Sequence, residues 1–259
     1  MVTLGTIFLA ETVGTMLLLL LGGGVVANNI LNGTKGKGTG FLMVNWGWGL
    51  AVFTGVVAAW KSGGHLNPAV TIGLAVNKLL TAAPGKPAEF VPGIPVDAAS
   101  ISVYILAQML GAFLGAVLVW LAYKKQFDAD QPEGFKLGVF STGPEIRSYA
   151  WNVVTEAIGT FVLVFFVIAL GYFAGDIGWL AALPVALLIV GIGASLGGPT
   201  GYAINPARDL GPRIAHALLP IPNKGSSDWS YSWVPVVGPI IGGVVAGLLG
   251  PVLLPLLGA

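Results

Sequence analysis

The chain has 259 residues, of which 55% are hydrophobic and only 9% are charged. Soluble domains carry about 25% charged residues, so this composition excludes an ordinary soluble fold and indicates a surface that faces lipid. The net charge of +1 excludes a basic nucleic-acid-binding face, and the absence of cysteine excludes disulfides and cysteine metal sites. Only two histidines occur, so metal catalysis is poorly supplied with ligands. We expect no metal site and no cofactor.

Six long stretches without charge follow one another along the chain. A helix needs about 20 apolar residues to cross the hydrocarbon core, and backbone groups in lipid must be paired internally. The first stretch lacks a basic n-region and a cleavage site, so we expect it to stay as a helix. Membrane-spanning helices are therefore predicted at about 5–27, 39–60, 99–123, 149–174, 178–196 and 231–257.

Two further apolar segments, about 67–78 and 205–218, are too short to span a membrane. Proline suits the first turn of a helix, where its missing N–H has no intrahelical partner to lose. Each segment is therefore predicted to be a half-helix that starts abruptly at Asn-Pro. The shared opening tripeptides are Asn67, Pro68, Ala69 and Asn205, Pro206, Ala207.

The chain also contains an internal repeat. Residues 10–15 resemble residues 155–160, and residues 65–70 resemble residues 203–208. Each half thus holds three spans and one half-helix, and an odd number of spans turns the second half over in the membrane. The prediction is one all-α domain over 1–259, made of two inverted halves joined by an extended loop. The halves cover about 1–125 and 145–259.

An inverted repeat brings the two half-helix N-termini together near the membrane midplane. Each N-terminus carries about half a positive charge, which opposes cations and protons. Asn67 and Asn205 would cap the helices and still offer amide N–H donors to a lumen. A water or hydroxyl oxygen could accept from both amides. The alternative is that both asparagines are structural caps only.

These segments resemble the major intrinsic protein (aquaporin) family, specifically its aquaglyceroporin or glycerol uptake facilitator branch. The similarity is strongest over Gly63–Thr71 and Gly198–Arg213 and covers essentially the whole chain. It implies six tilted helices, two half-helices and one pore per subunit of a homotetramer. It also implies passive diffusion of glycerol, small neutral solutes and water, in a bacterial plasma membrane with both termini cytoplasmic.

The same resemblance places the selectivity constriction at Trp48, Gly193, Tyr202 and Arg208. Glycerol has a carbon edge and a hydroxyl edge. The aromatic side chains would suit the carbon edge, and the guanidinium would hold the hydroxyl groups. Gly193 would leave room where water-selective relatives place a histidine.

Alternatives exist for three of these assignments. Trp48 could be an interfacial tryptophan, and a helix turns about 100° per residue, so only one of Trp46 and Trp48 can face a lumen. Arg208 could form a buried ion pair with Asp209. Tyr202 is commonly phenylalanine in the resembled channels, and its hydroxyl would either narrow the constriction or add a donor.

Glu11 and Glu156 occupy equivalent places in the repeat. We expect each carboxylate to accept backbone N–H bonds from a re-entrant loop, although two intramembrane carboxylates could also form a proton relay. Asp209 marks the glycerol branch and is expected to position loops. His65 is expected to line the vestibule or brace its loop. The pore-facing backbone carbonyls are predicted at Gly64, His65, Gly201, Tyr202 and Ala203.

The distribution of basic residues disagrees with the orientation that the family implies. On that topology Lys61, Lys78 and Lys86 lie inside while nine other basic residues lie outside or in the pore, against the positive-inside rule. Other possibilities are a channel for dihydroxyacetone, protonated lactic acid, urea or mainly water, and a proton-coupled transporter. The sequence contains no nucleophile–base set and no phosphate loop, so an enzyme is not expected.

Overall fold

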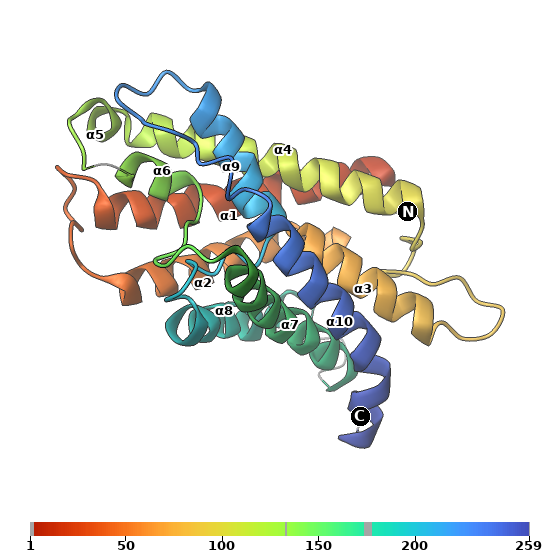
Figure 1. Ribbon diagram of the computed structural model, residues 1–259. Coiled ribbons are helices and arrows are strands. Elements are labelled where there is room, and N and C mark those ends of the chain that lie inside the picture. Colours follow the sequence, from red (N-terminus) through yellow and green to blue (C-terminus); the bar gives the residue numbers. More distant parts are fainter. Residues whose placement is uncertain (1–2, 133, 174–177, 259) are drawn as a thin grey trace.

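The computed structural model describes residues 3–132, 134–173 and 178–258 (Figure 1). Within these ranges the regular structure is helical, apart from an isolated β-bridge between Glu89 and Pro95. The long helices are α1 (Leu4–Ile30), α2 (Phe41–Ala58), α4 (Ala98–Ala122), α7 (Tyr149–Phe173), α8 (Ala182–Leu196) and α10 (Val234–Leu256). The half-helices are α3 (Pro68–Thr81) and α9 (Pro206–Leu218).

Five of the described helices are long and apolar enough to cross a membrane, namely α1, α2, α4, α7 and α10. The predicted span 178–196 corresponds to a shorter helix than expected, because α8 has 15 residues and follows a separate 3₁₀ turn, η2 (Gly178–Ala181). The predicted span 149–174 ends at a position outside the described residues. The six spans and two half-helices are otherwise placed as the sequence predicts.

The outer surface of the long helices is apolar, as a lipid-facing surface requires. Exposed large side chains on these helices include Leu9, Leu42, Leu50, Leu106, Trp151 and Val252. The buried set includes many small residues, and these allow close helix approach in lipid. A Cβ on Gly243 of α10 would lie 2.5 Å from the carbonyl oxygen of Ala69, so α3 and α10 are nearly in backbone contact.

The helix contacts repeat between the two halves. Helix α1 packs on α4 as α7 packs on α10, and α1 packs on α2 as α7 packs on α8. Half-helix α3 lies mainly against α10, and α9 lies mainly against α4, so each half-helix is held by the last span of the other half. In Figure 1, α3 and α9 run away from the centre of the bundle to opposite sides.

The connection between the halves differs from the predicted extended loop. It contains two short helices, α5 (Lys124–Asp128) and α6 (Phe135–Phe140). Phe127 and Phe140 are buried and their ring centroids are 5.4 Å apart, which folds this segment onto the bundle. The Nζ of buried Lys136 donates to the Pro222 carbonyl at 2.5 Å. Isolated phenylalanines in a polar stretch do not give a helical period, so the sequence did not indicate these helices.

Candidate functional site

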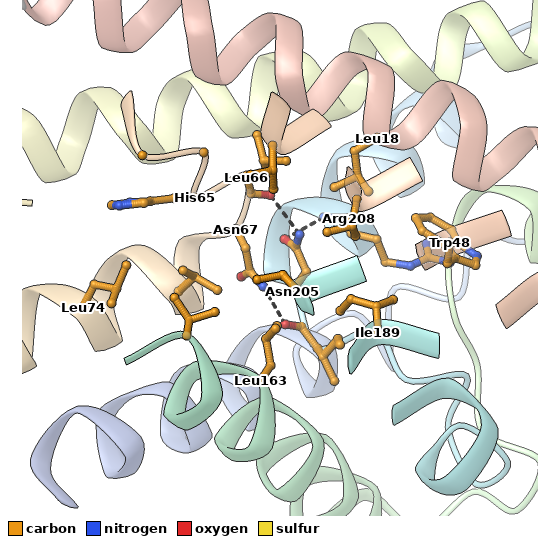
Figure 2. A pocket seen from close by; sticks show the side chains of 18 of the residues that line it. Leu18, Trp48, His65, Leu66, Asn67, Leu74, Leu163, Ile189, Asn205 and Arg208 are labelled. Carbon is orange, nitrogen blue, oxygen red and sulfur yellow. Dashed lines mark hydrogen bonds between the residues drawn. The ribbon is translucent and has the colours of Figure 1, made fainter. Parts of the chain in front are cut away.

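A cavity of about 360 Å³ passes between the two half-helix N-termini. Its wall is formed largely by apolar side chains from α1, α2, α3, α7 and α8, together with the loops that precede α3 and α9 (Figure 2). Nine of the predicted site residues line it, namely Trp48, Gly64, His65, Asn67, Gly201, Tyr202, Ala203, Asn205 and Arg208. The predicted residues outside this lining are Glu11, Pro68, Ala69, Glu156, Gly193, Pro206, Ala207 and Asp209.

Both half-helices begin at the asparagine of the repeated tripeptide. The Asn67 Oδ1 accepts from the Ala69 N–H at 2.9 Å, and the Asn205 Oδ1 accepts from the Ala207 N–H at 3.0 Å. A proline occupies the first turn of each helix. The local sequence therefore explains why both helices start here and aim their N-termini at the cavity.

The two asparagines also join the halves of the chain to each other. The Asn67 Nδ2 donates to the Ile204 carbonyl at 2.8 Å, and the Asn205 Nδ2 donates to the Leu66 carbonyl at 2.9 Å (Figure 2). A primary amide has two N–H donors, so one on each asparagine remains available to a molecule in the cavity. Sequence reasoning missed these two bonds, because no local signal specifies a partner in the other half.

The loops before the half-helices have an unusual backbone. Leu66, Tyr202 and Ile204 have φ values of 54°, 39° and 43°, which are uncommon for residues with a Cβ. Such conformations cost about 1–3 kcal/mol each and persist only where the surroundings impose them. The loops are therefore held in place by contacts from other elements.

Glu11 of α1 holds the first loop. Its carboxylate accepts from the His65 N–H at 3.0 Å, the Leu66 N–H at 2.7 Å, the Ser62 hydroxyl at 2.6 Å and the Gln108 amide at 3.0 Å. The side chain is fully buried. These four bonds support the carboxylate and fix the direction of the loop backbone.

Glu156 of α7 has the matching position in the second half. It accepts from the Ala203 N–H at 3.0 Å and from the Ile204 N–H at 2.7 Å.

Among the described residues, no hydrogen bond is donated to the five carbonyl oxygens predicted to face the pore. These oxygens are therefore free to accept from hydroxyl groups in the cavity.

Arg208 and Trp48 form adjoining polar and aromatic parts of the cavity wall. The guanidinium carbon lies 4.1 Å from the centroid of the Trp48 ring, and one guanidinium nitrogen donates to the Phe140 carbonyl at 3.2 Å. Trp48 is 6% exposed, whereas Trp46 is 48% exposed and does not line this cavity. The guanidinium keeps further N–H groups for a solute.

Asp209 is turned away from Arg208. Its carboxylate pairs with Arg213 at 2.8 Å and accepts from the Thr142 backbone N–H at 2.7 Å and hydroxyl at 2.8 Å. The Arg213 guanidinium in turn donates to the Thr142 and Ser227 carbonyls. The expected alternative of an Arg208–Asp209 pair is therefore wrong, because Asp209 fixes the neighbouring loops through Arg213.

The structure corrects the expectation that Gly193 leaves open space in the constriction. Gly193 does not line the cavity. A Cβ there would lie 2.7 Å from the Cζ of Tyr202 and 2.6 Å from the Oδ1 of Asn45. The space beside this glycine is filled by the Tyr202 ring, so Gly193 acts by admitting that ring.

His65 lies at the other side of the asparagine pair from Arg208 and Trp48 (Figure 2). Its ring is stacked on Tyr104 with the centroids 4.3 Å apart, and its Nδ1 is 3.1 Å from the Thr71 hydroxyl. These contacts brace the loop, and His65 also lines the cavity. Among the described residues no group of three or more His, Cys, Asp or Glu side chains could hold a metal ion.

Gly22 of α1 provides the space that Trp48 occupies. A Cβ on Gly22 would overlap the six-membered part of the indole ring. We expect Gly22→Ala to push Trp48 toward Arg208 and to lower solute flux through this cavity by about tenfold, since overpacking a dense site costs about 1–3 kcal/mol. Stopped-flow flux measurements on vesicles test this, with Gly24→Ala as the control, because a Cβ on Gly24 meets open space. Equal flux in both variants would contradict the prediction.

Comparison with known proteins agrees with this geometry. The sequence profile described as "Major intrinsic protein" matches residues 2–86 and 89–249. The chain is 50% identical to a glycerol uptake facilitator protein of Streptococcus pneumoniae over 229 residues, which cover 88% of this chain and 91% of that protein. It is 51% identical to a probable glycerol uptake facilitator protein of Thermotoga maritima, covering 90% and 93%.

A solved structure gives the same result. The aquaglyceroporin from Plasmodium falciparum superposes with a TM-score of 0.81 at 32% sequence identity, and the match covers 99% of both chains. The fold is thus shared over nearly the full length of both chains. The chain belongs to the major intrinsic protein family and is an integral, multi-pass membrane protein.

Proposed function

We propose that this protein is a passive channel for glycerol that also passes water and other small neutral solutes and excludes ions and protons. The observation that carries the proposal is the Arg208–Trp48 pair in a cavity that runs between two half-helix N-termini. The relatives named glycerol uptake facilitators support the choice of solute. They also favour a transport protein over an enzyme.

The cavity wall matches the two edges of glycerol. The carbon edge would lie against Trp48, the Tyr202 ring and the aliphatic wall. Hydroxyl oxygens would accept from Arg208 and from the free N–H groups of Asn67 and Asn205, while hydroxyl hydrogens would reach the free loop carbonyls. The guanidinium charge and the two helix N-termini would repel cations.

The carboxylates favour this passive mechanism over proton-coupled transport. Glu11 and Glu156 are buried outside the cavity lining and bind backbone N–H groups. Carboxylates held in this way support the loops and have no contact with the solute path. The proposed role of both residues is loop support, and the proposed role of Asp209 is to place the loops around Arg208.

The assembly and location are proposals on the basis of the family. We infer a homotetramer in a bacterial plasma membrane, with one pore per subunit and both termini in the cytoplasm. The bacterial relatives support the membrane. On this orientation most basic residues lie on the extracellular side or in the pore, against the positive-inside rule. Protease protection of a tag placed at either terminus is the measurement that decides the orientation.

Light scattering from proteoliposomes tests the function directly. After a glycerol shock, vesicles with the protein are expected to shrink and then re-swell faster than protein-free vesicles. A sucrose shock is the control, since the disaccharide should cause shrinkage without re-swelling. Fast shrinkage in both solutes with no re-swelling in glycerol would show a pore for water alone and would overturn the proposal.

A further inference from the structure

A short hairpin, residues 88–96, forms part of the cavity wall through the side chain of Val91. The Val91 carbonyl accepts from the Ile94 N–H at 2.9 Å. Pro92 and Gly93 lie between these two residues, and Gly93 has a φ value of 85°, which is the pattern of a type II turn. The turn is thus specified by its own sequence, and it fixes the backbone that carries the Val91 side chain.

Two buried side chains fasten this hairpin to the bundle. Phe90 and Ile94 are buried in a small apolar cluster that also contains Tyr104 of α4. The Phe90 ring contacts the Tyr104 ring at a centroid distance of 5.2 Å and the His65 ring at 5.0 Å. Adjacent residues of the hairpin therefore have different tasks. Phe90 holds the His65 imidazole from the protein side, and Val91 faces the cavity.

The His65 imidazole presents a hydrogen-bond acceptor to the cavity. The Thr71 hydroxyl donates its single proton to the Asn67 carbonyl at 3.2 Å and accepts from the Gln108 amide at 3.0 Å. Its contact of 3.1 Å with the His65 Nδ1 is therefore a bond that the imidazole donates. The Nε2 of this neutral ring is then an acceptor. It has no hydrogen-bond partner among the described residues and is not sealed from water, so it opens on the cavity.

Val91 and the His65 Nε2 meet at Gly63. A Cβ on Gly63 would lie 3.1 Å from the Val91 Cγ1 and 3.5 Å from the His65 Nε2, and all three residues line the cavity. The wall here offers carbon surface and an acceptor side by side. On the other side of the asparagine pair, Trp48 and Arg208 offer carbon surface and donors in the same way (Figure 2).

We propose that the hairpin 88–96 forms a second selectivity region, in which Val91 contacts the carbon edge of a polyol and the His65 Nε2 accepts from one of its hydroxyl groups. The inference rests on the proposed glycerol channel and adds a determinant of solute size to it. Val91 is the residue of the hairpin that lines the cavity. Its size therefore sets how far the hairpin extends into the solute path.

The size of the side chain at position 91 is the first test, read as the ratio of erythritol to glycerol permeability in proteoliposomes. Val91→Ala is expected to raise this ratio about tenfold and Val91→Phe to lower it by about as much, since one methylene in a pocket wall changes discrimination by about that factor or more. Val91→Ala only removes atoms, so it tests the proposal even where Val91→Phe fails to fold.

Val96 provides matched controls for both variants. It belongs to the same hairpin and packs against the same apolar cluster, but it does not line the cavity. Val96→Ala and Val96→Phe are expected to keep the ratio of the parent chain. A ratio that changes equally in Val91→Ala and Val96→Ala, or in neither, would overturn the inference. Glycerol flux through the parent chain above that of protein-free vesicles tests the proposed function separately.

Nitrogen NMR tests the acceptor without a flux measurement. The chain has two histidines, and His65→Phe assigns their signals. Adding glycerol is expected to shift the resonance of the unprotonated His65 Nε2. The His216 Nε2 is the internal control, because it is buried without a partner and lies outside the cavity lining, so its resonance should not move. A protonated Nε2 on His65, or an equal shift at both histidines, would overturn the proposed acceptor.

Discussion

Vesicles that contain the Arg208→Ala variant are expected to pass small cations and polyols larger than glycerol, both of which the parent chain is expected to exclude. The Arg208 side chain is buried, with 7% of its surface exposed, and its guanidinium lies against the Trp48 ring. A unit charge at about 4 Å opposes a cation by about 4 kcal/mol at an effective dielectric constant near 20. Removing it should therefore raise cation flux by up to on the order of 1,000-fold, since each 1.36 kcal/mol is a factor of ten, and a potassium-gradient dye assay measures this flux.

Arg208→Lys is the matched variant for this prediction. Lysine keeps the charge but not the planar fork that stacks on the indole and binds two oxygens. Cation exclusion should therefore remain, while glycerol permeability falls. Unchanged cation exclusion in Arg208→Ala would show that the ion barrier lies elsewhere along the cavity.

The second large effect is expected at Glu11. Glu11→Ala removes the acceptor of four hydrogen bonds and leaves the His65 and Leu66 N–H groups unpaired in the membrane. Each unpaired buried group costs about 1–3 kcal/mol, so we expect a loss of about 3 kcal/mol or more in unfolding free energy. Thermal unfolding of the detergent-purified protein measures this loss.

The control for Glu11 is an exposed glutamate. Glu145→Ala should leave the unfolding temperature nearly unchanged, because its side chain lies on the surface. Glu11→Gln also distinguishes the transport mechanisms. A proton-coupled transporter would lose the dependence of its flux on a pH gradient, whereas a channel has no such dependence to lose. A gradient-dependent glycerol flux in the parent chain would contradict the passive mechanism.

The half-helices could be predicted because their signals are local. An asparagine cap followed by proline defines a helix start within three residues, and Asn67 and Asn205 make the bonds that such caps make. The six spans follow from apolar length for the same reason. The exception is the predicted span 178–196, which divides into the 3₁₀ turn η2 and the shorter helix α8, a distinction that hydrophobicity does not encode.

The rest of the site depends on contacts between distant segments. Nothing near Gly193 in the sequence indicates that Asn45 and the Tyr202 ring lie beside it. A glycine in the sequence does not indicate whether the space beside it stays open or is filled by another side chain. The sequence therefore predicts open space at Gly193, where the structure places the Tyr202 ring. The Asp209–Arg213 pair was missed because Arg208 is the nearer basic residue in sequence, although Arg213 lies one helical turn away on the same face.

The reciprocal bonds of the asparagine amides have a consequence for how the protein is made. Asn67 binds a carbonyl 137 residues later in the chain, and Asn205 binds one 139 residues earlier. While the ribosome is still producing the second half, the first re-entrant loop lacks its partner and leaves an amide and a carbonyl unpaired. Both hydrogen bonds at the junction can therefore form only after the loop before α9 has been made, late in the synthesis of the chain.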